Sequence, residues 1–117
     1  MYRFVAILIV LSLSQFASAE SVSFGASLDP DGGHIGGSAS SVSGPATGRV
    51  HWAGKAITID TGFILPHFVH LEGTVTRSND PSLEGQAVMI DAIPGTDTII
   101  VTIGELSYAG AGHVTVR

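Results

Sequence analysis

Residues 88–103, VMIDAIPGTDTIIVTI, decide the fold, because two apolar runs there flank a short turn. The second run is almost entirely β-branched, and β-branched side chains fit an extended strand better than a helix. Pro94 and Gly95 suit the turn, since proline presets φ and glycine accepts positive φ. We therefore predict strands over residues 86–91 and 98–105. The nearly unbroken apolar second strand is expected to be central and buried on both faces.

The rest of the chain after residue 20 repeats this pattern of short strands and turns. Residues 21–28, 47–53 and 68–76 alternate apolar with polar side chains, which places each set on one face of a strand. No window there shows the three- and four-residue apolar spacing of a helix. We therefore predict an all-β domain, a small antiparallel β-sandwich or barrel of about eight short strands.

Three details of this pattern can be tested directly against a structure. Trp52 and Ile57 are expected in the core, because they alternate with charged and imidazole side chains. Residues 60–62 are expected to end or bulge the strand before them, ahead of residues 63–65. The last strand is expected over residues 112–117.

The N-terminus has the pattern of a cleavable secretory signal peptide. Arg3 is followed by an apolar run over residues 4–13, which is shorter than the roughly 20 residues that span a bilayer. Residues 17–19, Ala-Ser-Ala, are the small-x-small site that signal peptidase cuts, so the mature chain is expected to begin at Glu20. The alternative is an N-terminal membrane anchor. We expect residues 1–19 to be the signal and residues 20–117 one secreted or periplasmic domain, with no membrane span after cleavage.

The composition limits the chemistry and the partners of the mature chain. The sequence has no cysteine, so disulfides and thiolate sites are excluded, and packing, a bound ion or self-association must stabilise the domain. Without Arg3, four basic side chains stand against ten acidic ones. Nucleic acid is not an expected partner, because phosphate contacts need clustered Lys and Arg.

Asp91 and Asp97 are the candidate metal ligands, because they bracket the Pro-Gly turn. Their carboxylates could approach one another there, as oxygen ligands of Ca²⁺ must. The alternative is structural, since turn aspartates commonly accept backbone N–H bonds. His70 and Glu72 share a strand face, but two ligands are too few for a zinc site. Beyond a possible Ca²⁺, we expect no cofactor.

The second half of the chain resembles the post-COAP type domain of bacterial secreted proteins. The resemblance lies mainly in residues 69–117: the strand around Leu71-Glu72-Gly73-Thr74-Val75, residues 88–99 with their Pro-Gly turn, and the closing Gly112-His113-Val114-Thr115-Val116. Ile93 stands where that family usually has an acidic residue before the turn. The resemblance implies an all-β extracellular module without an established catalytic function.

We therefore expect a non-enzymatic secreted structural or binding module whose partner is an extracellular protein or carbohydrate. No catalytic residue is assigned, since the chain lacks a Gly-x-Ser-x-Gly elbow and its glutamates cannot be paired from sequence. Trp52, Tyr108 and Phe68 offer stacking surfaces, although the first and last are expected in the core. Two alternatives stay open: a small secreted enzyme or enzyme inhibitor, and a Ca-stabilised extracellular adhesion module.

Overall fold

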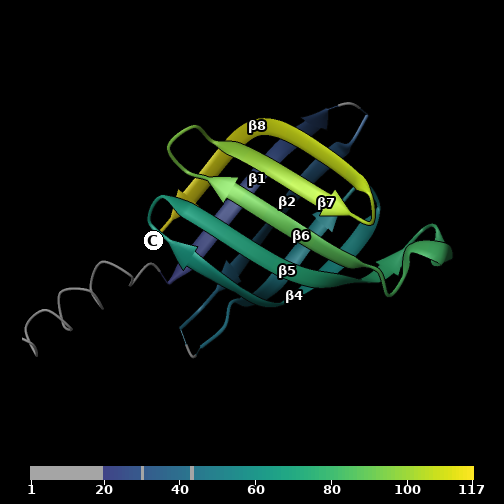
Figure 1. The fold of residues 1–117 in the computed structure, drawn as a ribbon, viewed down its shortest axis with the longest axis horizontal. Helices are drawn as coiled ribbons and strands as arrows, with labels where there is room; N and C mark the ends of the chain where they lie inside the picture. The colour runs from purple at the N-terminus through teal and green to yellow at the C-terminus, as the bar shows by residue number, and fades with distance from the viewer. Residues whose placement is uncertain (1–19, 30, 43) are drawn as a thin grey trace, which may run out of the picture.

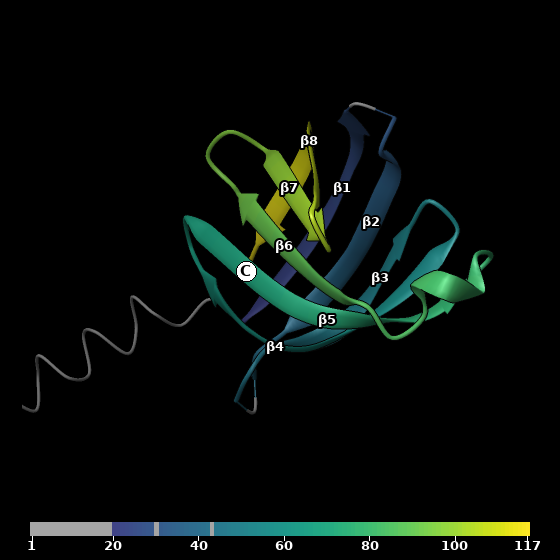
Figure 2. The same ribbon diagram turned by 45° about the vertical axis from the view of Figure 1, so that its right-hand side comes forward.

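The chain forms an eight-stranded antiparallel barrel (Figures 1 and 2) in the computed structural model, which describes residues 20–29, 31–42 and 44–117. Each strand pairs with its neighbours in sequence, and the last strand closes on the first. The elements are β1 (Ser21–Asp29), β2 (Gly33–Ser40), β3 (Thr47–Trp52), β4 (Lys55–Leu65), β5 (Phe68–Ser78), the 3₁₀ turn η1 (Pro81–Leu83), β6 (Ala87–Ile93), β7 (Thr98–Ile103) and β8 (Leu106–Val116). The all-β prediction is confirmed. The predicted signal peptide, residues 1–19, lies outside the described residues.

Alternation along most of the strands fills the barrel interior with apolar side chains. Residues such as Ile35, Leu71 and Ile90 are fully buried there. Among the described residues, Ser78 is the one buried polar side chain. Burial of this apolar surface is the main force that favours the fold. The lumen is therefore a packed core and leaves the outer wall and the two ends of the barrel for contacts with other molecules.

Four connections meet at one end of the barrel, which we call the mouth. Their described residues are 31–32, 53–54, 79–86 and 104–105. Ala53 and Gly54 have φ of 48° and 80°, so this connection is a two-residue turn with both central residues at positive φ. Glu20, Arg117 and the described residues of the other three connections lie at the opposite end.

Two β-bulges in the β4–β5 pair change which side chains face outward. Register shifts between Ile59 and Thr61, so that Ile59 is buried while Phe63, which strict alternation would turn inward, is 45% exposed. This confirms that residues 60–62 bulge the strand, and β4 continues through them. The second shift, between Ala56 and Ile57, leaves both Thr76 and Arg77 exposed.

Two sequence predictions about the C-terminal strands are wrong. β7 is not buried on both faces, since Ile99 is fully buried while Ile100 is partly exposed. In a closed barrel only one face of each strand meets the core. The last strand begins at Leu106 and not at residue 112.

Glycines explain why the start of β8 was missed. A Cβ on Gly110 would lie 2.0 Å from the Ser27 carbonyl oxygen, so glycine allows β8 to approach β1 closely. Glycine has no side chain to alternate with polar residues, so the two-residue apolar pattern of a strand is missing from the first half of β8. The core predictions for Trp52 and Ile57 are confirmed, at 2% and 1% exposure.

Candidate functional site

The mouth of the barrel holds a hollow of about 420 Å³ to which all four connections contribute. Its lining combines aromatic and aliphatic side chains with polar ones: Asp31, Gly32, Trp52, Ala53, Lys55, Leu83, Gln86, Ile103, Gly104, Glu105, Leu106 and Tyr108. Barrel mouths are common ligand sites, because the strands hold several loops around one concave surface. The mouth is therefore the first candidate for a binding site.

The floor of this hollow is fixed by the packing of Trp52 and Tyr108. The Trp52 Nε1–H donates a hydrogen bond of 2.6 Å to the Gly32 carbonyl oxygen, which satisfies the buried indole. Tyr108 meets Trp52 edge to face, with ring centroids 5.5 Å apart. Lys55 Nζ lies 4.4 Å from the centre of the indole ring, in a cation–π contact. Trp52 thus anchors the core, and the partly exposed Tyr108 offers the ring surface.

The rim of the hollow carries polar side chains that have no partner within the described chain. Asp31, Gln86 and Glu105 form no side-chain hydrogen bond or ion pair with any described residue. Leu106, next to them, is 58% exposed. An apolar surface beside free acceptors and donors is the composition expected of a ligand site.

A second cluster lies on the outer wall, where β5 and β6 place His70 between two carboxylates. His70 Nδ1 lies 2.5 Å from Asp91 Oδ1, and His70 Nε2 lies 3.1 Å from Glu72 Oε2. The hydrogen bond to Asp91 is the largest cause that raises the pKa of His70, the bond to Glu72 adds to it, and desolvation opposes both. Because both ring nitrogens are engaged, His70 has no free nitrogen to act as a general base in this arrangement.

Two phenylalanines border the His70 cluster. The Phe63 ring centroid lies 5.6 Å from that of His70 and 6.0 Å from that of Phe68. Phe68 is partly exposed on the wall and is not in the core, so that expectation was wrong. Register pairs His70 with Asp91 across the β5–β6 ladder, a contact that sequence reasoning missed.

Asp91 and Asp97 make separate protein contacts. Asp91 faces His70 on the wall, whereas Asp97 lies in the β6–β7 turn with φ of 52°. Asp97 Oδ1 accepts a 3.0 Å hydrogen bond from the backbone N–H of Val114, and its carbonyl oxygen accepts one from Gly112. In the described part of the chain, no group of three or more His, Asp or Glu side chains is placed to hold a metal. Calcium binding by Asp91 and Asp97 stays a prediction.

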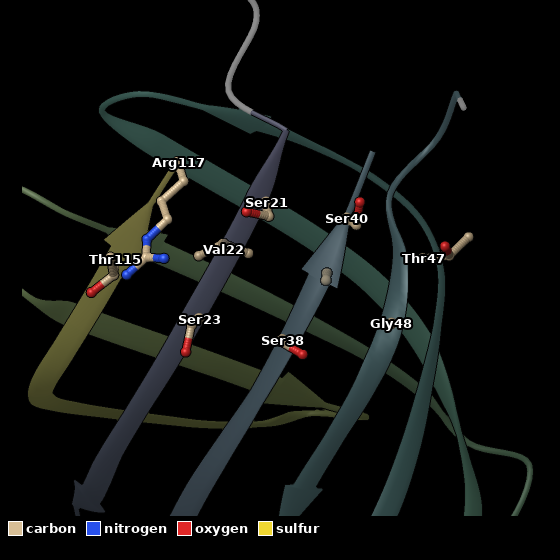
Figure 3. Close-up of a pocket in the computed structure, with 10 residues that line it drawn as sticks. Ser21, Val22, Ser23, Ser38, Ser40, Thr47, Gly48, Thr115 and Arg117 are labelled. Atoms are coloured by element: carbon tan, nitrogen blue, oxygen red, sulfur yellow. The ribbon is translucent and has the colours of Figure 1, made fainter. Parts of the chain in front are cut away.

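A second hollow, of about 460 Å³, lies on the outer wall of β8, β1, β2 and β3. Figure 3 shows Ser23, Ser38 and Thr115 on adjacent strands, with Arg117 beside Thr115. The sequence analysis missed this surface, which the alternating serines of β1 and β2 could have indicated, since every second residue of a strand faces the same side.

Comparison of the chain with protein-family models, with curated proteins and with solved structures gives no match. The resemblance to the post-COAP type domain therefore stays an expectation. None of the helices in the described ranges has the length and hydropathy needed to cross a bilayer.

Proposed function

We propose that the protein is a secreted, non-enzymatic binding module that takes its ligand at the mouth of the barrel. The observation that carries this proposal is the convergence of all four mouth connections on one hollow with an aromatic floor and an unpaired polar rim. A rigid barrel holds these loops in fixed positions, so a ligand would meet a largely preformed surface.

The hydrogen bonds of both His70 ring nitrogens favour a binding function over a catalytic one. A histidine that acts as general base hydrogen-bonds to its nucleophile through one nitrogen and to an orienting carboxylate through the other. In this protein both nitrogens meet carboxylates, and the cluster lies on the outer wall, away from the mouth. The His70 cluster therefore gives no geometric support to the enzyme alternative.

A carbohydrate is the ligand class that suits the mouth best. The ring of Tyr108 provides an apolar surface of the kind on which a sugar ring packs. Asp31, Gln86 and Glu105 supply acceptors and donors for hydroxyl groups around it. The expected ligand is therefore a sugar ring at the end of a glycan or a short oligosaccharide.

The single tryptophan makes the proposal directly testable. Trp52 is the only tryptophan in the chain and lines the mouth, so its fluorescence should report a ligand there. We expect a saturable change on titration with at least one member of a panel of hexoses, N-acetylhexosamines and their tetrasaccharides. Asp31→Asn/Glu105→Gln should weaken that binding, because both carboxylates are lost. Asparagine tolerates the positive φ of residue 31, so the turn should keep its conformation.

A charge-matched control separates the rim from general electrostatics. Asp60→Asn/Glu72→Gln removes two carboxylates that do not line the mouth and should bind like the wild type. If no sugar in the panel gives a saturable change, or if the protein converts a sugar into a product, the proposed function is wrong. Secretion is tested separately, by whether the exported protein has the mass of a chain that begins at Glu20.

A further inference from the structure

All four basic side chains of residues 20–117 line three hollows on the outer wall. The first is the hydroxyl-rich hollow with Arg117 (Figure 3). The second, of about 380 Å³, contains Arg49 and Arg77, and the third, of about 590 Å³, contains Arg77 and Lys55. Not one of the ten acidic residues of the chain contributes to the lining of the three. We call these hollows together the basic track.

The three hollows adjoin one another across neighbouring strands. Ser38 of the first hollow pairs across the β2–β3 ladder with Arg49 of the second. The second and third hollows share His51, Ala56 and Arg77. From β8 to β5 the basic track crosses five strand spacings, or about 24 Å around the wall. Five strand spacings are more than half of the eight around the closed barrel, so a polymer must curve with the wall to contact the whole track, and a straight segment contacts only part of it.

A β-bulge brings Arg77 to this surface. Strict alternation from the buried Val75 would turn Arg77 into the core, but the shift at Ala56 and Ile57 leaves Thr76 and Arg77 both exposed. Arg77 then pairs across the ladder with Ala56, and Ala56 pairs with His51. The small side chain of Ala56 leaves space between the two larger ones, which forms the floor of the second hollow.

The arginines of the basic track are not neutralised by the protein itself. Arg49 and Arg77 form no ion pair with any residue in the described ranges. Lys55 is different, because it stacks on Trp52 and helps to lower the pKa of Asp80, after the hydrogen bonds from Ser82. In a chain with so large an acidic excess, unpaired arginines gathered in one hollow make a local positive potential.

We propose that the basic track binds an acidic polysaccharide, with uronate carboxylates held by Arg49 and Arg77. The planar guanidinium forms bidentate hydrogen bonds with a carboxylate, and the wall hydroxyls of β1, β2 and β8 can bond to sugar hydroxyls. The third hollow shares Trp52, Ala53 and Lys55 with the mouth, but Arg49 and Arg77 do not line the mouth, so the inference goes beyond the proposed function. It adds a means by which the secreted protein is retained on an acidic glycan matrix.

Other anionic partners fit the basic track less well. Single-stranded nucleic acids stack their bases on exposed aromatic rings, and the one Phe, Tyr or Trp of the lining, Trp52, is 2% exposed. An acidic peptide that adds a strand needs a free sheet edge, and the closed barrel has none. A polysaccharide requires neither feature.

The inference is tested by the affinity of the secreted protein for two polymers with one backbone. Polygalacturonate should bind, and fully methyl-esterified polygalacturonate, which lacks the carboxylate charge, should bind at least tenfold more weakly. Arg49→Ser/Arg77→Ser should lower the affinity for polygalacturonate at least tenfold. The affinity of Arg49→Lys/Arg77→Lys should lie between those of the wild type and the serine variant, because lysine keeps the charge but loses the bidentate geometry.

Met89→Glu/Ser107→Glu is the control, since it makes the same change in net charge at exposed positions outside the basic track. It should bind polygalacturonate like the wild type. The inference is overturned if polygalacturonate does not bind, or if both polymers bind equally. It is also overturned if this control loses as much affinity as the arginine variant, or if DNA binds equally tightly. Arg49 and Arg77 do not line the mouth, so their serine variants should leave Trp52 fluorescence titrations with neutral sugars unchanged, and the two proposals fail independently.

Discussion

Replacement of Asp97 tests whether protein contacts or a bound cation hold the β6–β7 turn. Asp97 Oδ1 accepts a hydrogen bond from the partly buried N–H of Val114, and Asp97 itself has φ of 52°. Asp97→Ala therefore removes an acceptor and places a Cβ-bearing residue without a polar side chain in the left-handed region. Asp97→Asn is the matched control, because it keeps an oxygen acceptor and tolerates positive φ.

The two losses in Asp97→Ala can be estimated separately. An unsatisfied, partly buried N–H costs on the order of 1 kcal/mol. The left-handed conformation costs alanine roughly another 1 kcal/mol. Together they lower the free energy of unfolding by about 2 kcal/mol, which for a domain of this size shifts the midpoint by roughly 8–16 °C. Asp97→Asn should shift the midpoint by much less.

Thermal unfolding in excess chelator and in millimolar Ca²⁺ is the assay. With protein contacts alone, the wild type should give nearly the same midpoint in both buffers, and the loss in Asp97→Ala should be equal in both. A ligand that binds only the folded state would raise the midpoint in proportion to its affinity. A rise of many degrees in Ca²⁺ that Asp97→Ala abolishes would refute the structural reasoning and support the Ca-stabilised alternative.

Two further variants test the wall and the core. His70→Gln should lower the free energy of unfolding near pH 6 and lower it much less near pH 9. The pKa of His70 is raised above 6.5 in the folded protein, so its stabilisation is complete below pH 6.5 and disappears as the pH rises through the raised pKa. Urea unfolding at the two pH values measures this, and an equal loss at both would contradict it. Ile99→Ala should lower the free energy of unfolding by about 2–5 kcal/mol, since removal of its fully buried side chain leaves a cavity. Ile100→Ala should lower it clearly less, because Ile100 is partly exposed. Equal costs in denaturant unfolding would favour burial of β7 on both faces.

Local pattern was sufficient for the fold class and for much of the core. The alternation around Trp52 and Ile57 placed both in the interior, and the Pro94-Gly95 turn was correctly placed between β6 and β7. Pattern failed in β8, where the glycines needed for close contact with β1 remove the alternation itself. The choice between sandwich and barrel depends on the β1–β8 ladder, which joins the two ends of the domain and has no local signal.

The sequence by itself determined that this is a cysteine-free β-protein with an acidic excess, because composition and the two-residue period are properties of the chain read in order. Tertiary structure alone decided which side chains meet. His70 reaches Asp91 only through the register of β5 on β6. Arg77 reaches the wall only through a bulge, which reverses the alternation that sequence reasoning assumes. The mouth is formed by four connections far apart in sequence, which barrel closure alone gathers around Trp52 and Tyr108.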